Sequence, residues 1–109
     1  MKKKKLDLIF PGTILYEEFL EPLGITAYKL SKDIKVQQTA VSQIIKGRRR
    51  ITVDMALRLS RYFGNSAQFW LNLQNHYDLE LEAGEKESLI NEISPCTKSI
   101  ERFSTYASV

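Results

Sequence analysis

The strongest constraint on the fold is that apolar residues recur at helical spacing in short segments, separated by residues that start or end helices. Within each segment they return every three or four positions, as on one face of an amphipathic helix. No run alternates apolar and polar residues in the way that a half-buried strand does. A chain of 109 residues has enough material for one hydrophobic core. The sequence therefore predicts an all-α domain.

Five helices are expected, and their limits follow from capping residues. Helices commonly begin at threonine, serine or proline and end at glycine. The expected starts are Pro11, Thr26, Gln38, Thr52 and Ser66. In the same order, the expected ends are at Pro22 and Gly24, at Lys35, at Lys46 and Gly47, at Gly64, and at Gly84. Residues 85–93 have room for one or two further turns, whereas residues 94–109 show little periodicity. We therefore expect a weakly ordered C-terminal tail.

The composition disfavours enzymes and membrane proteins. One cysteine, Cys96, and one histidine, His76, leave no cysteine metal cluster and few acid–base constellations, so no catalytic site and no cofactor are expected. No apolar stretch approaches the roughly 18 residues of a membrane span. Lysines occupy positions 2–5, but residues 6–10 are too short for the apolar region of an export signal. A cytoplasmic location is therefore expected.

The charge is unevenly distributed along the chain. Residues 1–61 hold 13 lysines and arginines against 6 acidic residues, a net charge of +7. Residues 62–109 hold 3 against 7, a net charge of −4. A basic first half and an acidic second half indicate that an anionic partner, such as nucleic acid, meets the first half.

The segment ITAYKLSKDIKVQQTAVSQIIKGRRR has the pattern of a helix-turn-helix, with two short helices separated by about three residues. In this motif the start of the second helix faces base edges in the major groove of duplex DNA. Glutamine can pair with adenine, and the threonine methyl group can contact thymine. The predicted base-reading residues are Gln37, Gln38, Thr39 and Gln43. The apolar residues Val41 and Ile44 should face the core.

Four cations follow the base-reading residues within five positions. Lysine and arginine bind phosphates without reading sequence, and they supply most of the salt-dependent affinity. The predicted phosphate-binding residues are Lys46, Arg48, Arg49 and Arg50, and Arg58 and Arg61 lie where they could extend the same face. We divide the chain into a basic arm (1–9), a helix-turn-helix DNA-binding domain (10–83) and a C-terminal extension (84–109).

The same residues carry a resemblance to a known family. Several positions fall where the XRE/lambda-repressor-like family has them. They are Leu30, the small Ser31, Ser42, Ile44 and Lys46-Gly47. More narrowly, PGTILYEEFLEPLGITAYKLSKDI and ITVDMALRLSRYFGNSAQFWLNLQNHYDL resemble HigA-type antitoxins of HigBA addiction modules, some of which are called virulence-associated protein I. The resemblance covers residues 10–79. Two positions depart from it, because Ala27 replaces a frequent phosphate-binding glutamine and Lys35 replaces the usual turn glycine.

The resemblance implies a five-helix lambda-repressor-like fold and a homodimer formed through the C-terminal helices. It further implies a palindromic operator, whose binding represses the protein's own operon, and a complex that neutralises a small RelE-like ribonuclease toxin. Two other functions stay open. The chain could be a stand-alone XRE-type transcriptional regulator, or it could sequester a partner protein without reading DNA.

Two further groups of residues allow more than one interpretation. Phe69 and Trp70 could stack on bases, but their spacing with Leu73 favours a place in the core or a dimer interface. The second group is acidic and could either be solvated or meet a basic toxin; it consists of Asp78, Glu80, Glu82, Glu85 and Glu87.

Overall fold

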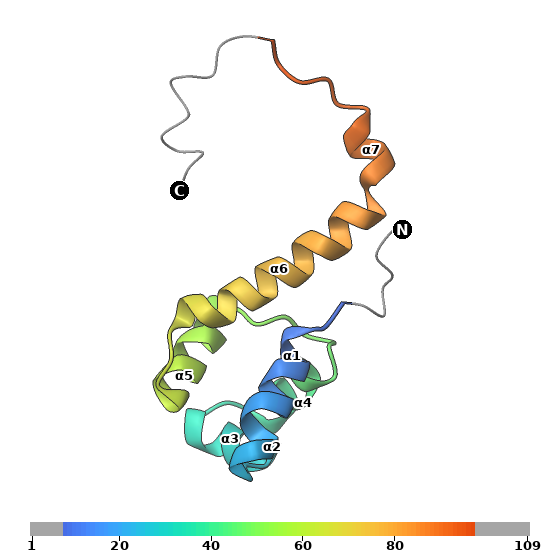
Figure 1. Ribbon diagram of the computed structural model, residues 1–109. Coiled ribbons are helices and arrows are strands. Elements are labelled where there is room, and N and C mark those ends of the chain that lie inside the picture. The colour runs from blue at the N-terminus through green and yellow to red at the C-terminus, as the bar shows by residue number, and fades with distance from the viewer. Residues whose placement is uncertain (1–7, 98–109) are drawn as a thin grey trace.

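A computed structural model describes residues 8–97, and within them the chain is entirely helical (Figure 1). The elements are α1 (Pro11–Ile14), η2 (Leu15–Leu20), α2 (Glu21–Leu23), α3 (Ala27–Ile34), α4 (Gln38–Ile45), α5 (Val53–Phe63), α6 (Ala67–Glu85) and α7 (Glu87–Asn91). The all-α prediction is confirmed. None of the helices described is long and apolar enough to cross a membrane. The lysine-rich arm at residues 2–5 and the end of the tail lie outside the described residues.

The elements α1, η2 and α2 form one continuous helix rather than three. Its middle is a π-helix, and the Glu21 N–H bonds to the Tyr16 carbonyl, five residues back. In a regular α-helix the ring of Pro22 would clash with the carbonyl four residues earlier, and the wider π turn precedes that proline. The expected end at Pro22 with Gly24 is therefore confirmed at Gly24, whereas Pro22 itself lies within the last turn. The helix ends at Gly24, which has a left-handed conformation with φ of 67°.

Three of the expected helix starts are confirmed with their capping side chains. The Thr26 hydroxyl oxygen accepts from the Lys29 N–H at 3.0 Å, and Thr52 accepts from Met55 at 3.2 Å. Ser66 accepts from the Phe69 N–H at 3.0 Å. Each bond satisfies a backbone donor that the first turn of a helix leaves without a partner.

The core lies where α3, α4, α5 and the first half of α6 meet the N-terminal helix. Trp70 is fully buried, and its indole N–H donates to the Asn65 side-chain oxygen at 2.9 Å. The rings of Phe19 and Trp70 lie 4.9 Å apart between centroids, and Phe63 joins the same aromatic cluster. Trp70 is therefore a core residue, as its spacing predicts. It stabilises the fold and does not stack on bases.

Close backbone packing joins the N-terminal helix to α4. A β-carbon added to Gly12 would lie 1.8 Å from the Ile44 carbonyl oxygen, so only glycine fits there. At the end of α4, Gly47 has a φ of 77° and lies under the ring of Phe10. Phe10 also contacts Tyr77 of α6 edge to face, with centroids 5.7 Å apart. These contacts fix the position of α4 relative to α1 and α6.

The C-terminal part of α6 and the short α7 extend away from the bundle (Figure 1). The expected break at Gly84 does not occur, because α6 continues to Glu85 and the turn falls at Lys86. A glycine costs a helix interior only about 1 kcal/mol relative to alanine, which one position can tolerate. The short helix α7 then forms within the region where one or two turns are expected, and residues 94–97 have no regular structure.

A polar cluster links α3 to α5 and contains a carboxyl group with a lowered pKa. The Tyr62 hydroxyl donates to Asp33 at 2.6 Å, and Lys29 forms an ion pair with the same carboxylate at 2.9 Å. The Tyr62 hydrogen bond, followed by that of Lys29, lowers the pKa of Asp33 below its ordinary value of 3.8. A carboxyl whose pKa is lower in the folded state stabilises the fold above its unfolded pKa.

We therefore expect thermal stability to decrease as the pH falls below about 4, through the lowered pKa of Asp33. The Asp33→Asn variant should lose part of this dependence, while keeping the helical content of the parent. Thermal melts by circular dichroism between pH 2 and pH 7 measure both slopes. Identical acid slopes for the parent and the variant would show that the cluster does not contribute.

Candidate nucleic-acid interface

The turn between α3 and α4 keeps the backbone shape of a helix-turn-helix without the usual glycine. Lys35 has φ of 63° and ψ of 48°, the left-handed conformation that glycine adopts most easily. The Arg58 guanidinium donates to the Ile34 carbonyl at 2.7 Å and to the Lys35 carbonyl at 3.3 Å. Arg58 therefore holds the end of α3 against α5. Arg58 thus has a structural role, and its predicted place on the DNA-binding face stays a prediction because its side chain is still 37% exposed.

The helix α4 separates its polar and apolar residues in the way that a reading helix requires. Gln37, Gln38 and Thr39 are exposed at its start. Gln37 occupies the cap position with an extended backbone, but its side chain makes no capping hydrogen bond. On the opposite side Val41 and Ile44 are almost completely buried. The expected burial of Val41 and Ile44 is confirmed, and the predicted base-reading residues at the start of α4 are free to face a ligand.

The fourth predicted base-reading residue is linked to the arginines. Gln43 lies on α4 and is partly exposed, and its side-chain oxygen accepts a hydrogen bond from Arg49 at 3.2 Å. The Arg49 side chain therefore lies back along α4. Gln43 still has its amide nitrogen, a donor that no hydrogen bond within the described residues occupies.

The four predicted phosphate-binding residues are all exposed, but they differ in their contacts. Lys46 and Arg48 form no ion pair with any described residue. Arg50 forms an ion pair with Asp78 of α6. The cations thus lie at the end of α4 and in the loop that follows it, and Arg49 and Arg50 line the same groove as Gln37 and Thr39.

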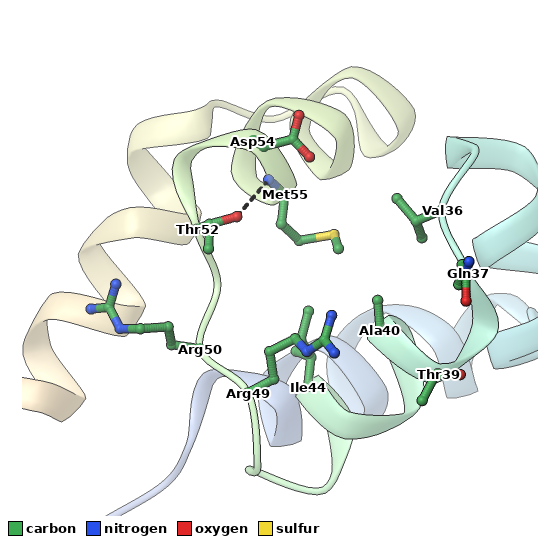
Figure 2. A pocket seen from close by; sticks show the side chains of 10 residues that line it. All are labelled: Val36, Gln37, Thr39, Ala40, Ile44, Arg49, Arg50, Thr52, Asp54 and Met55. Carbon is green, nitrogen blue, oxygen red and sulfur yellow. Dashed lines mark hydrogen bonds between the residues drawn. The ribbon is translucent and has the colours of Figure 1, made fainter.

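A shallow groove of about 340 Å³ separates the start of α4 from the start of α5 (Figure 2). Ala40, Ile44 and Met55 form its apolar floor, and Gln37, Thr39 and Arg49 lie at its rim. The groove therefore lies directly beside the predicted base-reading and phosphate-binding side chains. In the described part of the chain, no three His, Cys, Asp or Glu side chains are placed to hold a metal ion.

One residue that the sequence does not single out, Gln74, holds this region in place. Gln74 is 4% exposed on α6, and its side-chain oxygen accepts from the Ile51 N–H at 2.7 Å. Its amide nitrogen donates to Asp78 at 2.9 Å. Because 23 residues separate Gln74 from Ile51, no local pattern indicates the bond. The only local signal is a glutamine on the buried face of a predicted helix, where a polar side chain needs a partner.

Comparison with known proteins identifies the family. Residues 17–70 match the family model described as "Helix-turn-helix". The chain is 46% identical over 93 residues to virulence-associated protein I of Dichelobacter nodosus, covering 85% of each chain. It is 39% identical over 79 residues to antitoxin HigA-1 of Vibrio cholerae, covering 72% of this chain and 74% of the relative.

A solved structure agrees with these sequence relatives. The structure of the Pseudomonas aeruginosa antitoxin HigA with the higBA promoter superposes with a TM-score of 0.78 at 43% identity. The match covers 81% of this chain and 97% of that one. The predicted resemblance and the helix-turn-helix fold are confirmed. The chain belongs to the helix-turn-helix family of DNA-binding, non-enzymatic proteins that includes HigA antitoxins and virulence-associated protein I.

Proposed function

We propose that this protein is a cytoplasmic antitoxin that binds the operator of its own operon as a homodimer and neutralises a RelE-like ribonuclease toxin. The observation that carries the DNA-binding part is the exposed start of α4. Gln37, Gln38 and Thr39 face solvent there, and a groove at this end of α4 is lined by Gln37 and Thr39 together with Arg49 and Arg50. The side chains match the donors and acceptors of base edges, and the cations match the phosphates around them.

The comparison supports this assignment. The related HigA was solved with the higBA promoter, and antitoxin GraA was solved in complex with its operator at a TM-score of 0.79 to this chain. Lys35 keeps the conformation of the usual glycine, whereas Ala27 packs against the core and supplies no side-chain donor to a phosphate. A helix-turn-helix dimer on a palindromic operator would place one α4 in each half-site.

Exposed apolar side chains support the homodimer through the C-terminal helices. Leu79 on α6 is 71% exposed, and Leu89, Ile90 and Ile93 at α7 and just after it are each more than half exposed. Apolar side chains that cluster on a protruding element usually mark a surface that another chain covers. The acidic residues of the same helices suit a basic toxin, although Asp78 and Glu82 already pair with Arg50 and Lys86.

The toxin-binding part predicts that a gene next to the one for this chain encodes a small basic protein, and it is tested with that protein. We expect the two to elute together in gel filtration and the complex to lose the ribonuclease activity of the isolated neighbour. Separate elution, together with undiminished RNA cleavage at equimolar mixing, would contradict the antitoxin role. A stand-alone regulator would give that result while still binding DNA.

The phosphate contacts are tested by Arg48→Ala. Because Arg48 forms no ion pair with a described residue, we expect the substitution to leave stability unchanged. Operator affinity should fall, and the slope of log affinity against log salt should shrink by about 0.9, the value for one phosphate contact. Fluorescence anisotropy over a salt series measures both. An unchanged slope would remove Arg48 from the interface.

A further inference from the structure

The loop from Arg48 to Thr52, here called the arginine loop, is bonded to α6 at two adjacent residues. The Ile51 N–H donates to Gln74 at 2.7 Å, and both residues are buried, with Ile51 completely inaccessible. The neighbouring Arg50 donates to Asp78, one turn further along α6. A backbone bond and a side-chain bond therefore hold the same loop against the same helix.

The two acceptors on α6 are themselves connected. The Gln74 amide nitrogen donates to one carboxylate oxygen of Asp78 at 2.9 Å, while Arg50 takes the other oxygen. Gln74 thus has both ends of its amide group occupied and keeps the Asp78 carboxylate in one orientation. The resulting chain of bonds runs from the loop backbone through Gln74 and Asp78 to the Arg50 guanidinium.

Neighbouring arginines of the loop point in opposite directions. Figure 2 shows Arg49 lying over α4, whereas Arg50 extends away from the groove towards α6. Arg49 bonds to Gln43, and Arg50 bonds to Asp78. Despite its ion pair, the Arg50 side chain is 55% exposed. A guanidinium has five N–H donors, so one bond to Asp78 leaves donors that face solvent.

We propose that Asp78, aligned by Gln74, is a positioning residue for the DNA interface, and that it presents Arg50 to a phosphate of the operator. The inference rests on the proposed function. An arginine side chain loses conformational entropy when it binds a phosphate, because its rotatable bonds become fixed. Asp78 imposes that loss during folding, so that the guanidinium reaches the DNA already ordered.

The negative charge of Asp78 acts on DNA affinity in the opposite direction, so the sign of the change in affinity distinguishes the two effects. A carboxylate close to DNA repels phosphates, so removing any acidic group from α6 should tighten binding slightly. If Asp78 only neutralises Arg50, its removal should tighten binding further. If Asp78 positions Arg50, its removal should weaken binding although one negative charge is gone.

The experiment compares Asp78→Asn with Glu82→Gln in the full chain. Both changes remove one negative charge from α6 at nearly constant shape, and the asparagine side chain keeps an oxygen that can accept from Gln74. Glu82 pairs only with Lys86 among the described ion pairs, one turn beyond Asp78. Affinity is measured by fluorescence anisotropy on duplex DNA from upstream of the gene, over a salt series, after circular dichroism has confirmed equal helical content.

We expect Asp78→Asn to weaken operator binding about three- to tenfold and to reduce the salt slope by about 0.9, while Glu82→Gln leaves the affinity unchanged or slightly higher. In an Arg50→Ala background the Asp78→Asn change should no longer weaken binding, and the affinity should stay unchanged or rise slightly, as with Glu82→Gln. Equal or tighter binding by Asp78→Asn would overturn the proposal. If the parent protein binds operator and scrambled DNA equally, the proposed function is wrong and the inference fails with it. This outcome is read from the parent protein alone and is therefore distinct from a failure of the Asp78 proposal.

Discussion

The Gly12→Ala variant should unfold at a temperature at least about 10 °C below that of the parent, because a single methyl group has no room between α1 and α4. The added carbon would lie 1.8 Å from the Ile44 carbonyl oxygen and 2.6 Å from the carbonyl carbon. These neighbours are backbone atoms, so no side chain can turn aside. Forcing a methyl group into a packed site costs about 1–3 kcal/mol and more when backbone must move, and 1 kcal/mol corresponds to roughly 4–8 °C in a domain of this size.

Gly84→Ala is the matched control for this prediction. Gly84 lies inside α6, and nothing lies within 4 Å of the position that its β-carbon would take. Alanine favours a helix interior over glycine by about 1 kcal/mol, so this variant should be slightly more stable than the parent. Thermal melts of both variants by circular dichroism decide the matter. A Gly12→Ala protein that melts like the parent would contradict the packing of α1 on α4.

Replacing both Gln38 and Gln43 with alanine should weaken operator binding by about 2–6 kcal/mol, because each base contact that is removed costs roughly 1–3 kcal/mol. Both side chains reach solvent from the face of α4 opposite its buried residues, so stability should change little. Base contacts release no counterions from phosphates, and the slope of affinity against salt should therefore stay the same. Fluorescence anisotropy on the operator, over a salt series, measures both quantities.

The control for the glutamine pair is Gln68→Ala. Gln68 is an exposed glutamine of α6 that bonds to Asn72 and lies outside the predicted interface. Its removal should leave operator affinity unchanged. Toxin neutralisation, assayed separately, should be unaffected in both proteins. If the double variant binds the operator as tightly as the parent, Gln38 and Gln43 do not read bases, and the assignment of α4 as the reading helix is wrong.

Much of the fold could be predicted from the sequence because its signals are local. The Thr26, Thr52 and Ser66 caps bond to a backbone N–H three residues away, which a short window of sequence contains. The exposed start of α4 and its buried face follow from helical periodicity in the same way. Position along one helix thus determines which candidate side chains reach solvent, whereas their contacts with bases and phosphates stay a prediction.

The differences arise where distant contacts or unusual backbone geometry decide the structure. Pro22 lies inside a helix because a π turn precedes it, and no residue pattern announces that turn. Arg58 bonds to Ile34 across 24 residues, and Arg50 bonds to Asp78 across 28. The identity of a charged residue therefore predicts which chemical groups it can bind, but not which of these groups it contacts in the fold. Three of the cations assigned by pattern to one DNA-binding face, Arg49, Arg50 and Arg58, consequently have partners inside the protein.

Sequence-specific binding of the operator is tested by fluorescence anisotropy of the full chain on duplex DNA from immediately upstream of its own gene. Scrambled DNA of the same length is the control, and both are titrated over a salt series. We expect the affinity for the upstream DNA to exceed that for scrambled DNA by at least about 10³, with a steep salt dependence from several phosphate contacts. Weak and equal binding to both duplexes would contradict it.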